Sequence, residues 1–149
     1  MATLEGLTAD VDRVLAYFNA RTLDLPDGFF DRKTQFVING APFETLLGQS
    51  PNDPLILMLA RGPAGFRFTI KALQHAIPDA TVERGEITNS PQGLAVQLWL
   101  SGKLRGTDEA VNTVVPITLK VSAAGHVEIA EAVLDAPILE KIRQARLRP

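Results

Sequence analysis

Apolar residues recur at two different spacings, and the change of spacing divides the chain. Between Arg61 and Glu83 they first follow one face of a helix, at Phe66, Ile70, Leu73 and Ile77. Pro78 and Asp79 end that helix. Beyond them the pattern alternates with the period of strands. The chain upstream is therefore expected to be mainly helical and the chain downstream mainly β.

The upstream part opens with an amphipathic helix, predicted by the apolar stripe Leu4, Leu7, Val11, Val14, Leu15 and Phe18. A turn or short second helix is expected at 25–28, and a first strand at 34–39. The all-apolar run 55–60 has no readable period. Asp53 as cap and Pro54 at the first helical position favour a helix there, with a buried strand as the alternative.

The downstream part predicts strands at 81–88, 94–101, around 115–121 and at 127–134, with turns at 89–93 and 123–126. In the second of these strands Leu98 and Leu100 face one way, and Gln97 and Trp99 face the other. Asp135 can cap a terminal helix whose buried side carries Ile138, Leu139, Ile142 and Ala145.

Composition narrows the class of protein. The 149 residues, 46% of them hydrophobic, predict one domain over 1–149. A net charge of −2 gives no field for nucleic acid, and no apolar run reaches the length of a membrane span. The absence of cysteine and of a secretory signal pattern predicts a cytoplasmic protein with no nucleic-acid or membrane partner.

Few residues offer recognisable chemistry. His75 and His126 are the only histidines, and with no cysteine and no acidic cluster beside them we predict no metal site. The chain also lacks a Gly-x-Ser-x-Gly elbow and a phosphate-binding loop, so no cofactor is predicted. The basic residues near the end are expected of a helix C-terminus and have no interleaved aromatic residue.

Helices, a long meander of strands and a closing helix predict an α+β fold with helices on one face of a curved sheet. In detail, Arg61-Gly62 before a helix, Ile77-Pro78-Asp79 after it, and the strands that follow resemble the nuclear transport factor 2-like superfamily. The SnoaL-like and ketosteroid-isomerase-like branches are the most similar. The resemblance implies a cone: a curved, largely antiparallel but mixed sheet around N-terminal helices, with a short C-terminal helix.

The resemblance also implies an apolar pocket whose inward polar groups decide the chemistry. Those groups are missing at the matching positions. The isomerase tyrosine matches Val14, with Tyr17 one turn away, and the general base matches Ile38 or Asn39. The third acid matches Ile117 in the register that the alternation favours, or else Thr118, and the cyclase His and Asp match Ala130 and Ala132. We therefore assign no catalytic residue.

Our first hypothesis is a binding domain for an apolar small molecule. The polar contacts expected in its pocket are Tyr17, Asn39 and Thr118. The apolar lining is expected from Phe18, Phe36, Ile38, Phe66, Ile70, Leu98, Leu100, Ala132 and Leu134. Because Gln97 and Trp99 should lie on the outer face of the sheet, where the superfamily often dimerises, we also predict a homodimer through that face.

Two alternatives remain open. One is a cyclase, isomerase or hydrolase with relocated catalytic groups, for which Asp31 and Glu44 are the carboxylates to test. The other is a structural or interaction domain whose own side chains fill the pocket.

Overall fold

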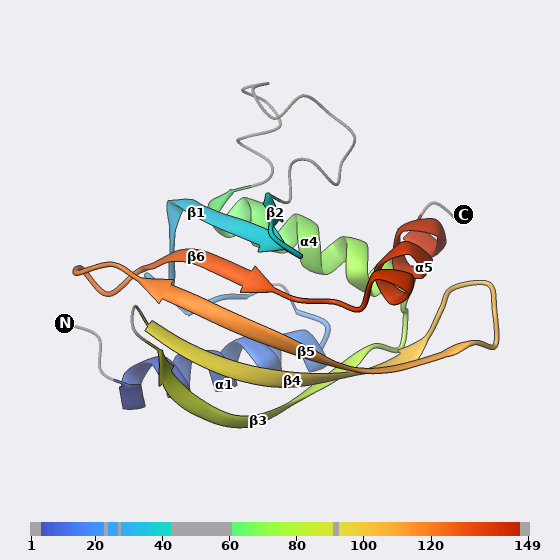
Figure 1. The fold of residues 1–149 in the computed structure, drawn as a ribbon, viewed down its shortest axis with the longest axis horizontal. Helices are drawn as coiled ribbons and strands as arrows, with labels where there is room; N and C mark the ends of the chain where they lie inside the picture. The colour runs from blue at the N-terminus through green and yellow to red at the C-terminus, as the bar shows by residue number, and fades with distance from the viewer. Residues whose placement is uncertain (1–3, 23, 27, 43–60, 91–92, 147–149) are drawn as a thin grey trace.

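The computed structural model describes residues 4–22, 24–26, 28–42, 61–90 and 93–146. Within them the chain forms helices and strands in the order α1 (Leu4–Asn19), β1 (Phe30–Ile38), β2 (Ala41–Pro42), α4 (Gly62–Ala76), β3 (Thr81–Ser90), β4 (Gly93–Lys103), β5 (Ala110–Val121), β6 (Val127–Ala132) and α5 (Ala136–Arg146) (Figure 1). The predicted opening, central and terminal helices are thus confirmed.

The strands form one curved sheet in the order β2-β1-β6-β5-β4-β3 (Figure 1). All neighbours are antiparallel except β1 and β6, which run parallel. Helix α4 lies over β1, and α1 lies against β3. The protein is therefore α+β with a mixed sheet wrapped round helices, as expected.

The pairing of β4 with β5 fixes which side chains face the helices. Leu98 is opposite Val115, and Trp99 is opposite Val114. Leu100 and Val115 are buried, whereas Trp99 and Val114 are exposed. Because side chains alternate along a strand, this register turns one apolar row of each strand toward the helices and leaves the other on the outer face.

Strand β1 begins at Phe30, four residues before the predicted start. The polar run Asp31 to Lys33 hides this extension in the sequence. In the structure Thr34 is fully buried, donates its hydroxyl to the Val127 carbonyl and accepts the backbone N–H of Asp31 at 3.0 Å. These bonds join the strand to β6 across a register shift, so a non-local contact decides where β1 starts.

Strand β6 ends at Ala132 instead of Leu134. The backbone leaves the ladder because Leu134 donates its N–H to the side chain of Asn39 at 2.7 Å, and Asn39 donates its amide to the Leu134 carbonyl at 2.9 Å. Strand β3 extends to Ser90, so the predicted turn at 89–93 is shorter than expected. The run 55–60 lies outside the described residues.

The C-terminal end of α4 is tightly packed. Ala76 and Ile77 have no exposed surface. Arg105, from the connection between β4 and β5, donates its backbone N–H to the Ala76 carbonyl at 2.7 Å and its Nε to the His75 carbonyl at 2.6 Å. A Cβ atom on Gly102 would lie 2.3 Å from Cγ2 of Ile77, so only glycine fits there. We call this region the packed end.

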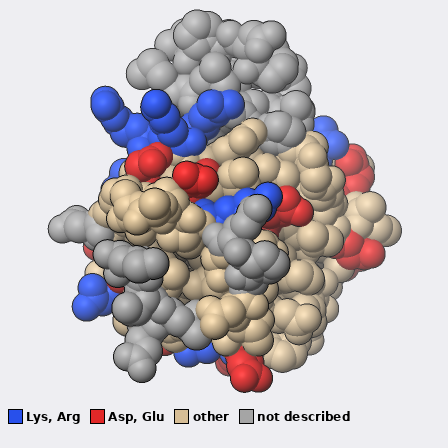
Figure 2. Space-filling model, turned by 60° about the vertical axis from the view of Figure 1, so that its left-hand side comes forward, with Lys and Arg blue, Asp and Glu red and all other residues tan. Residues whose placement is uncertain are grey.

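Polar contacts hold α1 against β3. The side chain of Asn19 exchanges two hydrogen bonds of 2.9 Å with the backbone of Val82. Arg84 forms a two-pronged ion pair with Asp12. The hydrogen bonding between the Arg84 guanidinium and the Asp12 carboxylate lowers the pKa of Asp12 and raises the pKa of Arg84. Figure 2 shows further charged side chains of both signs interspersed over one face of the surface.

Candidate functional site

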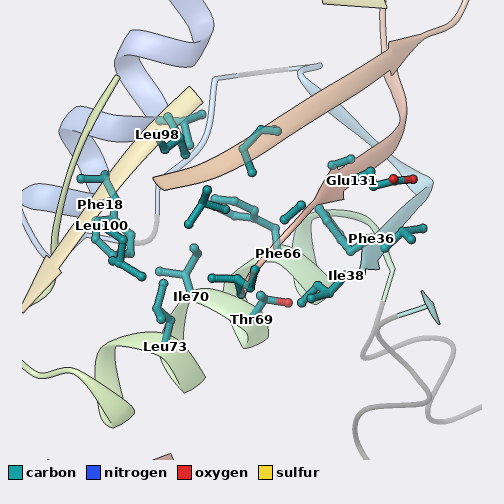
Figure 3. Close-up of a pocket in the computed structure, with 18 of the residues that line it drawn as sticks. Phe18, Phe36, Ile38, Phe66, Thr69, Ile70, Leu73, Leu98, Leu100 and Glu131 are labelled. Atoms are coloured by element: carbon teal, nitrogen blue, oxygen red, sulfur yellow. The ribbon is translucent and has the colours of Figure 1, made fainter. Parts of the chain in front are cut away.

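A cavity of about 290 Å³ lies between the helices and the sheet (Figure 3). It separates two groups of buried apolar residues. One group, around Ile77, Leu100 and Val115, belongs to the packed end. The other, around Phe30 and Phe36, lies beneath the opposite half of the sheet. Both groups contribute side chains to the cavity wall, so the cavity occupies the place where a continuous core would otherwise be.

Helix α4 supplies one wall. Its residues Phe66, Thr69, Ile70 and Leu73 recur at helical spacing and point into the same space (Figure 3). The sheet supplies the facing wall through the inward rows of its strands, such as Leu98 and Leu100. The four α4 residues are half-buried, whereas Leu100 on the facing wall is buried.

Aromatic rings form one end of the cavity. The ring of Phe30 lies 5.3 Å from that of Phe36 and 5.1 Å from that of Phe66, and the first pair is edge-to-face. Phe36 and Phe66 are 6.2 Å apart. These spacings are those of favourable aromatic pairs, so the three rings hold one another in place around an apolar space.

Nine of the twelve predicted pocket residues line this cavity. They are the apolar ones: Phe18, Phe36, Ile38, Phe66, Ile70, Leu98, Leu100, Ala132 and Leu134. The periodicity of the sequence found them because it reports which face of each element is turned inward.

The three predicted polar contacts do not line the cavity. Tyr17 lies on the flank of α1, while Val14, Leu15 and Phe18 face inward. The side chain of Asn39 is exposed and bonded to the backbone of Leu134. Thr118 lies between the inward-facing Ile117 and Leu119, and therefore on the opposite face of β5. This placement corrects the predicted polar lining.

Three polar residues that the sequence did not single out lie in the wall instead: Thr69, Glu131 and Arg143. Thr69 donates its hydroxyl to the Gly65 carbonyl at 2.8 Å, one turn earlier in its own helix. Figure 3 shows the carboxylate of Glu131 at the edge of the site, turned away from Phe66. Every other lining residue in the described part of the chain is apolar.

Most of the positions that the resemblance matches to catalytic groups carry apolar side chains, whereas the alternative matches Asn39 and Thr118 are polar and do not line the cavity. Val14, Ile117, Ala130 and Ala132 all line the cavity. Of the two carboxylates considered as replacements, Asp31 is not part of the described wall, and its Oδ1 accepts the backbone N–H of Lys33 at 2.6 Å. Glu44 lies outside the described residues.

Nowhere among the described residues do three His, Asp or Glu side chains gather as metal ligands would. None of the described helices is long and apolar enough to cross a membrane.

The outer face of the sheet carries the large apolar side chains that the described residues expose. Trp99 is 44% exposed, Val114 38% and Val133 47%. Trp99 and Val114 are register partners, and Val133 donates its N–H to the carbonyl of Pro116, two residues beyond Val114. We call Trp99, Val114, Pro116 and Val133 the outer strip. Gln97, opposite Pro116, is also exposed on this face.

Sequence comparison with protein-family profiles and with curated proteins found no match. Comparison of structures found many. TsrD from Streptomyces laurentii superposes with a TM-score of 0.69 at 12% identity, over 97% of this chain and 99% of that one. A putative SnoaL-like polyketide cyclase from Jannaschia sp. CCS1 gives 0.64 at 12% identity, over 96% and 93%.

TerC, co-crystallized with polyporic acid, gives a TM-score of 0.66 at 10% identity, over 93% of this chain and 98% of that one. Similar structures also include proteins described as NTF2-like, as a cystatin fold and as a ketosteroid isomerase-like fold. At these identities the likeness shows the fold, and the activity has to be argued from the cavity itself.

Proposed function

We propose that this protein binds small apolar molecules in its central cavity. The chain adopts the nuclear transport factor 2-like fold, and the proposal starts from that fold. One observation carries the proposal: the wall is apolar throughout the interior. A hydrophobic ligand would gain from leaving water there, at about 25 cal/mol per Å² of apolar surface buried. The cavity volume is close to the lower end of known ligand sites, about 300 Å³.

Binding accounts for the site better than catalysis does. An acid or base must reach the reacting atoms of a substrate. In the described wall the titratable side chains are Glu131 and Arg143, and the carboxylate of Glu131 is turned away from the interior. The relocated-enzyme hypothesis therefore has no inward acid among these residues to support it. The filled-core hypothesis would require side chains in a space that the described residues leave empty.

The test is to fill the cavity and measure binding. Ala132→Phe puts a ring into the space, whereas Ala110→Phe adds the same ring at an exposed strand position outside it. We expect naphthalene to bind the wild type and Ala110→Phe in calorimetric titration, and to bind Ala132→Phe at least tenfold more weakly. Equal binding to both variants would contradict the proposal, and so would the absence of binding to the wild type.

We also propose that the protein forms a homodimer through the outer strip. Exposed tryptophan and aliphatic side chains in one contiguous patch are typical of interfaces between copies of a chain. The ring of Trp99 also lies against Gly85, 3.5 Å from where a Cβ atom would be. Replacing Trp99 would therefore uncover the backbone of β3 as well as the patch.

Val114→Lys is the cleaner test of the dimer, because Val114 faces outward and has no part in the cavity. We expect light scattering at micromolar concentration to give a dimer for the wild type and a monomer for this variant. Asn112→Lys, two residues earlier on the same face of β5, should remain dimeric. A monomeric wild type would contradict the proposal.

A further inference from the structure

Among the described residues, the interior of the cavity offers no free hydrogen-bond donor to an acceptor group of a ligand. Apart from the charged residues Glu131 and Arg143, the polar side chain in the described wall is that of Thr69. Its hydroxyl already donates to the carbonyl of Gly65. A buried polar group without a hydrogen bond costs roughly 1–3 kcal/mol in proteins. Any polar end of a ligand is therefore favoured only where the wall carries charge.

Lys141 and Arg143, which lie two residues apart on α5, have different surroundings. Lys141 donates its Nζ to the carboxylate of Glu109 at 2.6 Å, on the connection between β4 and β5. Arg143 lines the cavity, beside Leu139 and Ile142 of the same helix. A cation in the last turn of a helix is expected from the helix dipole alone. The helix dipole does not explain why Arg143 lies at the cavity wall.

The guanidinium of Arg143 is held only weakly by its neighbours. It donates Nη1 to Glu140 at 3.2 Å, and both side chains are just over half exposed, at 52% and 55%. Exposed pairs of this kind contribute about 0.2–1 kcal/mol. A guanidinium has five donors in a fork that matches a carboxylate, so it can receive an anion while giving up little.

We propose that the ligand of this cavity is an apolar molecule with one anionic end, and that Arg143 binds that end. The inference rests on the proposed binding function. The ligand's body lies between Phe66, Ile70 and Leu98, and its carboxylate or enolate oxygen reaches the guanidinium at the rim. The volume is roughly twice that of the cavity of about 150 Å³ that holds benzene, so two fused rings fit.

The experiment compares 2-naphthoate with 2-naphthamide, which has the same body and no charge. By calorimetry at pH 7.5 we expect the wild type to bind naphthoate about fivefold more tightly than the amide, the effect of one exposed ion pair. Arg143→Gln should bring the two affinities together, because it removes the charge that favours naphthoate over the amide. Arg143→Lys should keep part of the preference, and Glu140→Gln should strengthen naphthoate binding about twofold by removing its competitor.

Lys141→Gln is the matched control on the same helix and should bind both probes as the wild type does. Melting curves by circular dichroism confirm that each variant is folded. Equal affinity of the wild type for the two probes, or a preference that survives Arg143→Gln, would overturn this inference and leave the binding function intact. Failure of naphthoate, naphthamide and naphthalene to bind would overturn both.

Discussion

The packed end and the cavity are built from the same kinds of side chain and differ in how closely these meet. Helix α4 passes through both. At its C-terminal end Ala76 and Ile77 are fully enclosed by Gly102 and by the connection that carries Arg105. One to two turns earlier, Ile70 and Leu73 are half-buried and line the cavity. An apolar face is therefore not by itself a core, because burial also requires the facing element to lie within contact distance.

The largest expected effect tests this comparison with one substitution at two places. Ile77→Ala should reduce the free energy of unfolding by about 4 kcal/mol, because the Ile77 side chain is fully buried and loses contacts on every side. Ile70→Ala should cost about 2 kcal/mol, because part of that side chain already faces the cavity. Urea titrations give both values. Equal losses would mean that the two regions are packed alike.

Gly102→Ala tests how little room the packed end has. The added methyl would overlap Ile77 and approach Asp79 Oδ1 to 3.0 Å, so we expect a loss of about 3 kcal/mol. Gly40→Ala is the control: no atom lies within 4 Å of its Cβ position, and only its positive φ of 79° opposes the change, by about 1 kcal/mol. Thermal unfolding checks the order, and a tolerated Gly102→Ala would contradict it.

A larger side chain should lower the stability of the protein at the packed end and raise it at the cavity. Ala76→Leu overpacks an enclosed site and should cost about 2 kcal/mol. Ala132→Leu extends into the cavity and should stabilise the protein by about 1 kcal/mol, since each buried methylene contributes about 0.8 kcal/mol. Urea midpoints measure both changes. A destabilising Ala132→Leu would show that the cavity wall cannot accept another side chain.

The smallest effect separates electrostatics from packing. The bond from Arg84 lowers the pKa of Asp12 in the folded protein, so the pair stabilises above the unfolded pKa of about 3.9. That contribution is lost as the pH falls through the lowered folded pKa. Because the pair is exposed, Asp12→Asn should cost only about 0.5 kcal/mol at pH 7, and nothing once the carboxyl is protonated.

Urea unfolding of wild type and Asp12→Asn at pH 7 and pH 2.5 makes the measurement, with the exposed Asp24→Asn as control. A difference that does not shrink between pH 7 and pH 2.5 would assign the effect to packing instead of charge.

Much of the architecture could be read from local patterns. The spacing of Phe66, Ile70 and Leu73 predicted the inward face of α4, and the alternation through Leu98 and Leu100 predicted the inward row of β4. Both predictions are confirmed, because the direction of a side chain relative to its own helix or strand is a local property. The nine apolar residues of the cavity follow from the same rule.

The remaining features depend on contacts between distant parts of the chain. Asn39 was expected inside the pocket, but it bonds to Leu134, 95 residues away. Strand β1 pairs in parallel with β6, and this pairing with the bonds of Thr34 sets its length. Arg143 is one cation among several at the end of the sequence until α5 is placed beside α4, at the wall of the cavity.

The sequence thus established which side chains turn inward and, through the order of its elements, the α+β cone. Whether those side chains meet was decided by the tertiary structure. Leu98 and Ile70 line the cavity from its two walls, while the absence of a side chain at Gly102 lets the backbone lie close to Ile77. The periodicity of a sequence shows which way a side chain points but not how far it lies from its neighbours, and that distance is what separates a packed core from a cavity.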